Sequence, residues 1–432
     1  MGDPEDTPGA TGRRPRVGLL SLGAGLAAAG VGAALGVAAE RLAVGRPLLP
    51  PSDDDGPGYG EDYGGLHVPG VVVGADDGTP IHVEIEEPDA AHAARIARGE
   101  QAPLTVVLSH GYALSMDSWH FQRKALRGRH RMVLWDQRGH GRSGTGPPGS
   151  ATIDQLGRDL AAVIDAVAPD GPLVLVGHSM GGMTVMALAD RRPEVFAERV
   201  VGVALVSTSA GGLADVDFGV AAFGPLVQRL APGALRTLNR TPRLVERARR
   251  LGSDLEAVLV RRWSYASDVP PALVAFTARM LAATRLEVIA DYLPTFSEHD
   301  KRAALAALDG IEVLVIVGDR DLLTPAAHSE AIVEVLPGAE HVVVRHAGHL
   351  LLLEHPEVVN EHLAGLVDRA LRSWPKGGAR PGRRIRLPGI RRTVTSLRGA
   401  GSRGRRGGRQ GEQGRADGAR RRGRGRRSDG AA

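Results

Sequence analysis

A serine lies within a cramped, glycine-rich stretch near the middle of the chain. Gly177, Ser179 and Gly181 fit the pattern G-x-S-x-G, which follows an apolar run and precedes a helical one. A strand-to-helix turn this tight forces the serine into a strained backbone conformation and requires glycine beside it, since larger side chains would collide with the strand and the helix. The turn would place the hydroxyl at a helix N-terminus, where free N–H groups favour a developing anion. Ser179 is therefore the candidate nucleophile.

Two other residues have the types and positions needed to activate this serine. A serine hydroxyl needs a general base at neutral pH, and the base needs an acid to orient it. Asp321 follows an apolar run in GDRDLLTP, and His349 follows the next apolar run in HAGH. The order Ser, Asp, His along the chain is the one expected for a site of this kind on a parallel sheet. We therefore predict Asp321 as the acid and His349 as the base.

Residues of the same types stand close to both choices. Asp319 precedes the candidate acid by two positions, while His346 and His355 flank the candidate base. The spacing of His341, His346 and His349 also suggests metal ligands. Strand alternation puts the first two on opposite faces, so we expect no metal there. A Gly-His loop after the final strand favours His349, because a base in that loop can reach across to the nucleophile.

Backbone groups next to the serine would bind the oxyanion. The apolar run at 104–110 ends in HGYALSMDSW, so that the N–H of Tyr112 can face the site. The N–H of Met180 follows the nucleophile directly. We predict that these two N–H groups form the oxyanion hole.

The elements that must position these residues alternate in type. Fully apolar runs lie at 104–110, 131–136, 173–178, 200–207, 312–319 and 341–346, after the two strand-like stretches HVPGVVV and IHVEIEE. Amphipathic helical stretches separate most of them. Strands that are apolar on both faces and alternate with helices indicate a mostly parallel sheet covered on both sides. Ligands of such sheets bind beyond the carboxyl ends of the strands, where the candidate residues stand.

Five motifs in this order resemble the α/β-hydrolase fold superfamily, in its branch of single-domain lipases, esterases and non-haem haloperoxidase-like enzymes. They are HGY at 110–112, DQRGHGRS at 136–143, GHSMGG at 177–182, GDRDLLTP at 318–325 and AGH at 347–349. The resemblance implies an α/β fold with a mostly parallel eight-stranded sheet and the roles given above to Ser179, Asp321 and His349. It treats Asp136, Arg138 and His140 as mainly structural.

The resemblance implies hydrolysis of carboxylic esters through an acyl-serine, without a cofactor or a metal. Acyl transfer and perhydrolysis would use the same triad. A serine at the nucleophile position, Ser179, argues against an epoxide hydrolase or a haloalkane dehalogenase. Those enzymes need an alkyl-enzyme ester formed on aspartate. A binding or receptor module without catalysis is the alternative from another class.

We place the hydrolase domain at 66–375, with a helical cap at 210–300 inserted after the sixth strand. The insertion is rich in Leu, Ala and Val with helical periodicity, and it resembles the cap that closes over this family's site and excludes water. Five of its aromatic residues either line the substrate pocket or pack between helices: Phe218, Phe223, Trp263, Tyr265 and Phe276.

The N-terminal part raises the question of a membrane. After a short segment at 1–16 that contains three arginines, residues 17–39 hold no charge over 23 positions, which is long enough to span a bilayer. This segment is either a transmembrane anchor or a signal peptide cut near Val37–Ala39, and 40–65 would be a linker. We expect a hydrolase domain held at the membrane outside the cytoplasm, or secreted, and a small-molecule or lipid ester as substrate.

The C-terminal part carries a different charge from the rest. Residues 376–432 hold 19 Lys or Arg and three acids, whereas the whole chain has a net charge of +5, so residues 1–375 are acidic. A Gly/Arg-rich segment with so little apolar content is expected to be disordered. A solvated tail without a particular task is the favoured interpretation, because charge runs are common. Contact with an anionic surface is the functional alternative, and nucleic-acid binding is not favoured. The chain has no cysteine, which excludes disulfides and a cysteine nucleophile.

Overall fold

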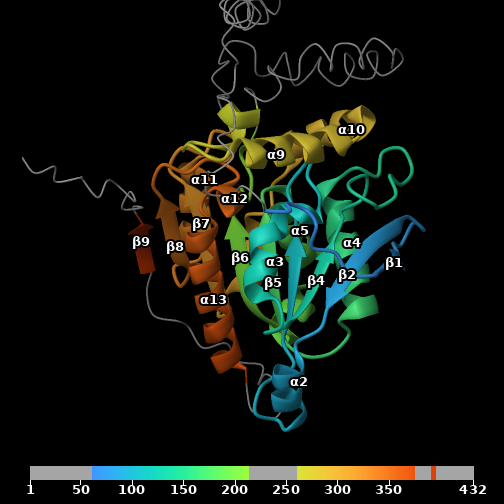
Figure 1. Cartoon of the computed structure of the whole chain (residues 1–432), viewed down its shortest axis with the longest axis vertical. Coiled ribbons are helices and arrows are strands. Elements are labelled where there is room, and N and C mark those ends of the chain that lie inside the picture. The colour runs from blue at the N-terminus through green and yellow to red at the C-terminus, as the bar shows by residue number, and fades with distance from the viewer. Residues whose placement is uncertain (1–60, 214–259, 375–390, 396–432) are drawn as a thin grey trace, which may run out of the picture. The chain divides into compact units, whose positions relative to one another are not determined.

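The computed structural model describes residues 61–213, 260–374 and 391–395. Its centre is one sheet, drawn with its surrounding helices in Figure 1. The strands are β1 (Gly70–Gly74), β2 (Pro80–Glu86), β3 (Thr105–Ser109), β4 (Arg131–Trp135), β5 (Leu173–His178), β6 (Val200–Val206), β7 (Glu312–Gly318), β8 (Glu340–Val344) and β9 (Arg391–Thr395). The first eight correspond to the eight predicted strands, so the predicted α/β fold class is confirmed.

The strands are ordered β1-β2-β4-β3-β5-β6-β7-β8-β9 across the sheet. β1 and β2 pair antiparallel with each other, and β2 pairs antiparallel with β4. All other pairs are parallel. The carboxyl ends of β3, β5, β7 and β8 therefore meet along one edge of the sheet.

The ninth strand corrects the prediction for the C-terminal part. Residues 391–395 fall inside the segment that we expected to be disordered, yet they pair in parallel with β8 in the register Glu340↔Arg391 to Val344↔Thr395. Three residues of this strand are β-branched, a type that suits extended backbone, and the open edge of β8 offers unpaired backbone groups to it. The rest of 376–432 lies outside the described residues, as do the predicted segments 1–16 and 17–39.

Helices cover both faces of the sheet. One face carries α3 (His120–Leu126), α12 (Leu351–Glu354) and α13 (Pro356–Ser373); the other carries α4 (Ile153–Val167), α5 (Met180–Arg191), α6 (Pro193–Glu198), α11 (Ala326–Val335) and the 3-10 helix η3 (Ala303–Leu308). α2 (Ala90–Ala97) precedes β3, and the 3-10 helix η1 (Met116–Trp119) precedes α3. Within the described residues, no helix is long and apolar enough to cross a membrane.

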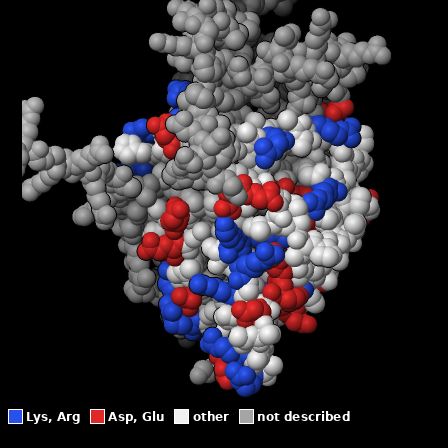
Figure 2. Space-filling view, viewed as in Figure 1, with Lys and Arg blue, Asp and Glu red and all other residues white. Residues whose placement is uncertain are grey.

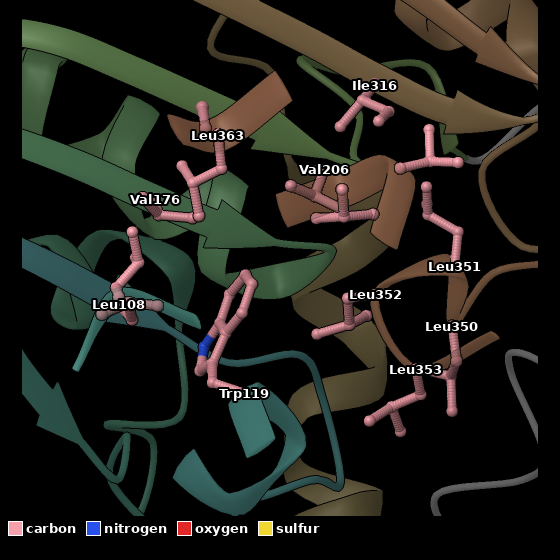
Figure 3. Packing of buried hydrophobic residues seen from close by; sticks show 14 of the residues in the cluster. Leu108, Trp119, Val176, Val206, Ile316, Leu350, Leu351, Leu352, Leu353 and Leu363 are labelled. Atoms are coloured by element: carbon pink, nitrogen blue, oxygen red, sulfur yellow. The ribbon is translucent and has the colours of Figure 1, made fainter. Parts of the chain in front are cut away.

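Strand alternation divides the apolar side chains between two cores. In β3, Leu108 packs on the α13 side, whereas Val107 packs on the α4 and α5 side. Figure 3 shows side chains of the first core, among them Leu108, Trp119, Val176 and Leu363. Each fully buried side chain of this size contributes about 1.5–3 kcal/mol relative to an exposed one.

The helical stretches described in the predicted cap are residues 260–264, α9 (Pro271–Ala283) and α10 (Leu286–Glu298). Figure 1 shows α9 and α10 beyond the carboxyl ends of the strands. The insertion is closed at its base, because Lys301 N donates to Ala210 O at 2.7 Å and His299 Nε2 bonds Ser209 O at 3.0 Å. Residues 214–259, including Phe218 and Phe223, lie outside the described residues.

Two cap aromatics with predicted pocket roles have packing partners in the structure. The Tyr265 hydroxyl bonds the Thr277 hydroxyl at 2.5 Å, and both residues are buried. Phe276 stacks on Tyr63 with 5.5 Å between ring centroids. Trp263 is half-buried. Tyr265 therefore fits the helix-packing alternative better than a pocket wall.

The surface carries charges of both signs. Figure 2 shows acidic and basic side chains interspersed over the described part of one face. Many of them form ion pairs, such as Lys124 with Glu61 at 2.8 Å and Arg131 with Glu87 at 2.9 Å. Exposed pairs of this kind contribute at most about 1 kcal/mol each.

Candidate active site

Ser179 occupies the sharp turn between β5 and α5. Its backbone has φ 52° and ψ −117°, a conformation that non-glycine residues adopt at a cost of about 1–3 kcal/mol. The turn is held because Ser179 N donates to Val206 O at 2.9 Å and Thr208 Oγ1 donates to Ser179 O at 2.7 Å. Strain maintained by surrounding hydrogen bonds is typical of functional sites.

The two glycines of the motif are required by close backbone contacts. A Cβ on Gly177 would collide with the Gly181 carbonyl, and a Cβ on Gly181 would collide with the Ser109 carbonyl. β5, α5 and the end of β3 thus approach too closely for any side chain. The glycine pattern predicted this steric requirement.

Asp321 and His349 are joined at the same edge of the sheet. His349 Nδ1 lies 2.9 Å from Asp321 Oδ2 and 3.0 Å from Oδ1. The carboxylate also accepts from Leu323 N, Thr324 N and Thr324 Oγ1, each at 2.9 Å. Burial alone would raise the pKa of Asp321, but the interaction with His349 and these hydrogen bonds outweigh it and lower the pKa below its usual value. Asp321 is therefore ionised and can accept a hydrogen bond from His349 Nδ1.

The alternative residues lie elsewhere. Asp319 is exposed, and its Oδ1 accepts from Ala347 N at 3.3 Å. His346 is exposed, and His355 Nε2 bonds its carbonyl oxygen at 3.1 Å. His341 Nε2 bonds Ser329 Oγ at 2.9 Å. Among the described residues, no group of three or more His, Cys, Asp or Glu side chains is arranged to hold a metal ion.

The loop that carries His349, called the base loop below, lies against the turn that carries Ser179. His178 Nε2 donates to the His349 carbonyl oxygen at 3.1 Å, and the two imidazole rings are 4.9 Å apart. Ser179 is half-buried, and its hydroxyl makes no hydrogen bond to the rest of the described chain. Catalytic hydrogen bonds often tighten only when substrate binds, so an open serine is compatible with this arrangement.

The two predicted oxyanion donors have free N–H groups. Met180 is the first residue of α5, so its N–H has no partner within the helix. Neither Met180 N nor Tyr112 N donates to an acceptor among the residues that the structure describes. A Cβ on Gly111 would lie 2.6 Å from His178 Nδ1, so the loop that carries Tyr112 abuts the nucleophile turn.

Two buried histidines hold the Tyr112 loop in place. His140 Nε2 accepts from Ala113 N at 3.1 Å, where Ala113 has a φ of 58°, and His110 Nε2 accepts from Gln137 N at 2.9 Å. Burial lowers the pKa of His110 to about 4 and that of His140 to about 3. Both rings are therefore neutral at pH 7, which leaves each Nε2 able to accept.

Asp136 and Arg138 of the DQRGHGRS loop are buried and paired. Asp136 accepts from Met116 N at 2.8 Å and from Arg142 N at 2.9 Å. Arg138 forms two hydrogen bonds of 2.6 Å to Asp159. These contacts join the loop to its neighbours and do not reach Ser179.

The side chain of Tyr112 contacts the cap. Its hydroxyl donates to Ile289 O in α10 at 2.5 Å, and its ring meets Phe296 edge-on with 5.0 Å between centroids. This contact joins residues 177 positions apart, and no local signal in the sequence pointed to it. The cap and the predicted oxyanion loop thus form one packed unit.

Known proteins are similar to this chain in sequence or in structure. Polyketide synthase ThaQ from Burkholderia thailandensis is 30% identical over 359 residues, which cover 81% of this chain and 15% of the synthase, so the chain spans only a small part of that protein. 3-oxoadipate enol-lactonase 2 from Acinetobacter baylyi is 27% identical over 274 residues, covering 61% of this chain and 88% of the lactonase. The structure of a thermophilic esterase from Thermogutta terrifontis is 25% identical, with a TM-score of 0.52 and coverage of 70% of this chain and 100% of the esterase.

A family model described as the alpha/beta hydrolase fold matches residues 105–356, which include all three predicted triad positions. The match extends over more than half of the chain and agrees with the sheet order, the strained serine turn and the Asp-His pair. The chain therefore belongs to the α/β-hydrolase fold family.

Proposed function

We propose that the protein is a serine hydrolase that cleaves carboxylic esters through an acyl-serine intermediate. The observation that carries the proposal is the convergence at one sheet edge of a strained Ser179, the His349–Asp321 pair and two N–H groups that donate to no other residue in the described part of the chain. The relatives support this reaction class, since one is named an esterase and another an enol-lactonase.

The tautomer of His349 determines the first step. Because ionised Asp321 accepts from Nδ1, the neutral ring carries its proton there and leaves Nε2 free to accept. Nε2 takes the Ser179 proton as the hydroxyl oxygen attacks the ester carbonyl carbon. The carbonyl π electrons move to oxygen, and this oxyanion accepts from Tyr112 N–H and Met180 N–H.

Collapse of the tetrahedral intermediate breaks the bond to the alcohol oxygen. His349 gives the proton it gained to the departing alcohol, which leaves the acyl group on Ser179. Water then enters, loses a proton to His349 and attacks the acyl carbon. The second collapse returns the proton to Ser179 Oγ and releases the carboxylic acid, so the enzyme ends unchanged.

The location of the protein and its further contacts are proposed from the sequence alone. We infer that residues 17–39 either hold the domain at a membrane or direct its export, because the 23 positions carry no charge. A lipophilic ester would suit such a location. The basic segment 376–432 would add attraction to an anionic surface. Separating membrane and soluble fractions of cells that express the full chain, with and without residues 17–39, tests this location.

The reaction is tested with p-nitrophenyl esters of increasing acyl length, using the purified full chain and its Ser179→Ala variant. We expect hydrolysis that disappears in the variant, together with labelling of Ser179 by a fluorophosphonate. If both proteins are equally inactive across the series and the probe leaves Ser179 unlabelled, the proposal is wrong.

A further inference from the structure

Glu354 lies at the end of α12 and joins two segments that are far apart in the sequence. Its Oε2 accepts from Gly348 N at 2.6 Å, while its Oε1 accepts from Ala266 N at 2.8 Å and Ser267 N at 2.5 Å. Gly348 precedes the candidate base, and Ala266 and Ser267 belong to the cap. One carboxylate therefore connects the base loop to the cap.

The backbones of these two segments are also in direct contact. Leu350 N donates to Ser264 O at 2.9 Å. A Cβ on Gly348 would lie 2.7 Å from Ser264 O and 2.9 Å from Tyr265 Cα. Gly348 is thus needed because the cap segment passes directly over it. The hydroxyl bond of Tyr265 to Thr277 continues the connection into α9.

A carboxylate suits this place better than a neutral side chain. Glu354 is 9% exposed, and three backbone N–H groups converge on its two oxygens. A buried carboxylate is stabilised by several N–H donors, and hydrogen bonds to an ion are stronger than neutral ones. Glutamine has a single acceptor oxygen. Its NH2 group would face the backbone N–H groups of either the base loop or the cap, which are donors as well. It could bond the base loop or the cap, but not both.

We propose that Glu354 is a positioning residue that holds the cap against the base loop, so that docking of the cap and placement of His349 depend on each other. The catalytic part of this proposal rests on the ester hydrolysis proposed above. Glu354 itself touches no reacting atom. It acts through Gly348, whose neighbour His349 must lie within hydrogen-bond reach of Ser179 for proton transfer.

The test compares Glu354→Gln with Glu357→Gln, a matched control in which the replaced glutamate is exposed at the start of α13. Rates are measured with short and long p-nitrophenyl esters and normalised to sites titrated with a fluorophosphonate, so that loss of folded protein does not count. We expect Glu354→Gln to lower kcat per site by about 10- to 100-fold, as for a misplaced catalytic group. Its preference among acyl lengths should also weaken, because the cap is no longer held. The control should match the wild type.

Hydrogen exchange tests the connection without any substrate. In Glu354→Gln, peptides that contain 264–267 and 346–350 should both exchange at least about tenfold faster, whereas the control should not change. If that variant does not fold, the wild type decides: the amides of Ala266, Ser267 and Gly348 should be protected to a similar extent.

The outcomes separate the two proposals. A wild type that hydrolyses no ester contradicts the proposed reaction. The exchange result would still test whether Glu354 holds the cap against the base loop. An active wild type with an unchanged kcat, unchanged acyl preference and unchanged exchange in Glu354→Gln overturns the role of Glu354. Faster exchange in only one of the two segments overturns it as well.

Discussion

Replacing Asp321 by asparagine should abolish nearly all activity while leaving the fold intact. The carboxylate is fully buried. It accepts hydrogen bonds from His349 Nδ1, from two backbone N–H groups and from the Thr324 hydroxyl. The asparagine oxygen can keep the backbone N–H groups, and its NH2 then faces the Thr324 hydroxyl and His349. Because NH2 is a donor, it favours a ring that accepts at Nδ1 and carries its proton at Nε2. That tautomer cannot accept the proton of Ser179.

The expected loss follows from this exchange of tautomers. In triads of this geometry the wrong tautomer lowers kcat by about 10⁴-fold, which corresponds to about 5.4 kcal/mol of transition-state stabilisation. Substrate binding should change little, because the side chain does not contact the ester. Steady-state hydrolysis of p-nitrophenyl butyrate gives kcat and KM, and urea unfolding gives the stability.

Asp319→Asn supplies the matched control, since Asp319 is two residues away and exposed. It should retain kcat within about twofold of the wild type, in line with the small effects of most surface substitutions. The reasoning is refuted if Asp321→Asn keeps more than about a tenth of the wild-type kcat, or if Asp319→Asn loses as much.

Three further predictions concern the surroundings of the site. Tyr112→Phe keeps the backbone N–H but loses the hydrogen bond to Ile289 O. One such bond is worth about 1 kcal/mol, so kcat/KM should fall about fivefold. An unchanged kcat/KM would contradict the link to the cap. Gly181→Ala should destabilise the protein by more than about 3 kcal/mol in urea unfolding, because the added Cβ meets a backbone carbonyl that cannot move away; a loss below about 1 kcal/mol would show that the turn has room. His110 and His140 are neutral in the folded protein, with pKa values of about 4 and about 3, but gain a proton near pH 6.5 when unfolded. Their contribution to stability is therefore complete above pH 6.5 and is lost as the pH falls toward 4, by about 1.4 kcal/mol per pH unit for each; unfolding free energies that stay level from pH 6.5 to 4.5 would contradict this.

Much of the fold and of the candidate site could be predicted because their signals are local. Six apolar runs and two strand-like stretches identified eight strands, since a strand buried on both faces is apolar at nearly every position. The positions of Ser179, Asp321 and His349 followed from the rule that parallel strands present their carboxyl ends at one edge. The structure brings Asp321 and His349 within 2.9 Å and places the His349 loop against the serine turn.

Other features depend on contacts that leave no local pattern. β9 is five residues long and lies among arginines and glycines, so composition masked a strand that only the edge of β8 makes favourable. The bonds of Glu354 to the cap join residues 87 and 88 positions apart. A glutamate at the end of a short helix does not by itself predict such partners. The path of the chain through the insertion determines them.

The most direct test of the central claim is to trap the acyl-enzyme. The full chain is mixed with p-nitrophenyl acetate, quenched in acid within milliseconds, digested and analysed by mass spectrometry. The account predicts that the peptide containing Ser179 gains one acetyl group, in an amount equal to the initial burst of p-nitrophenol, and that Ser179→Ala shows neither. Steady release of p-nitrophenol with no adduct on Ser179, or an adduct on another residue, would contradict the account.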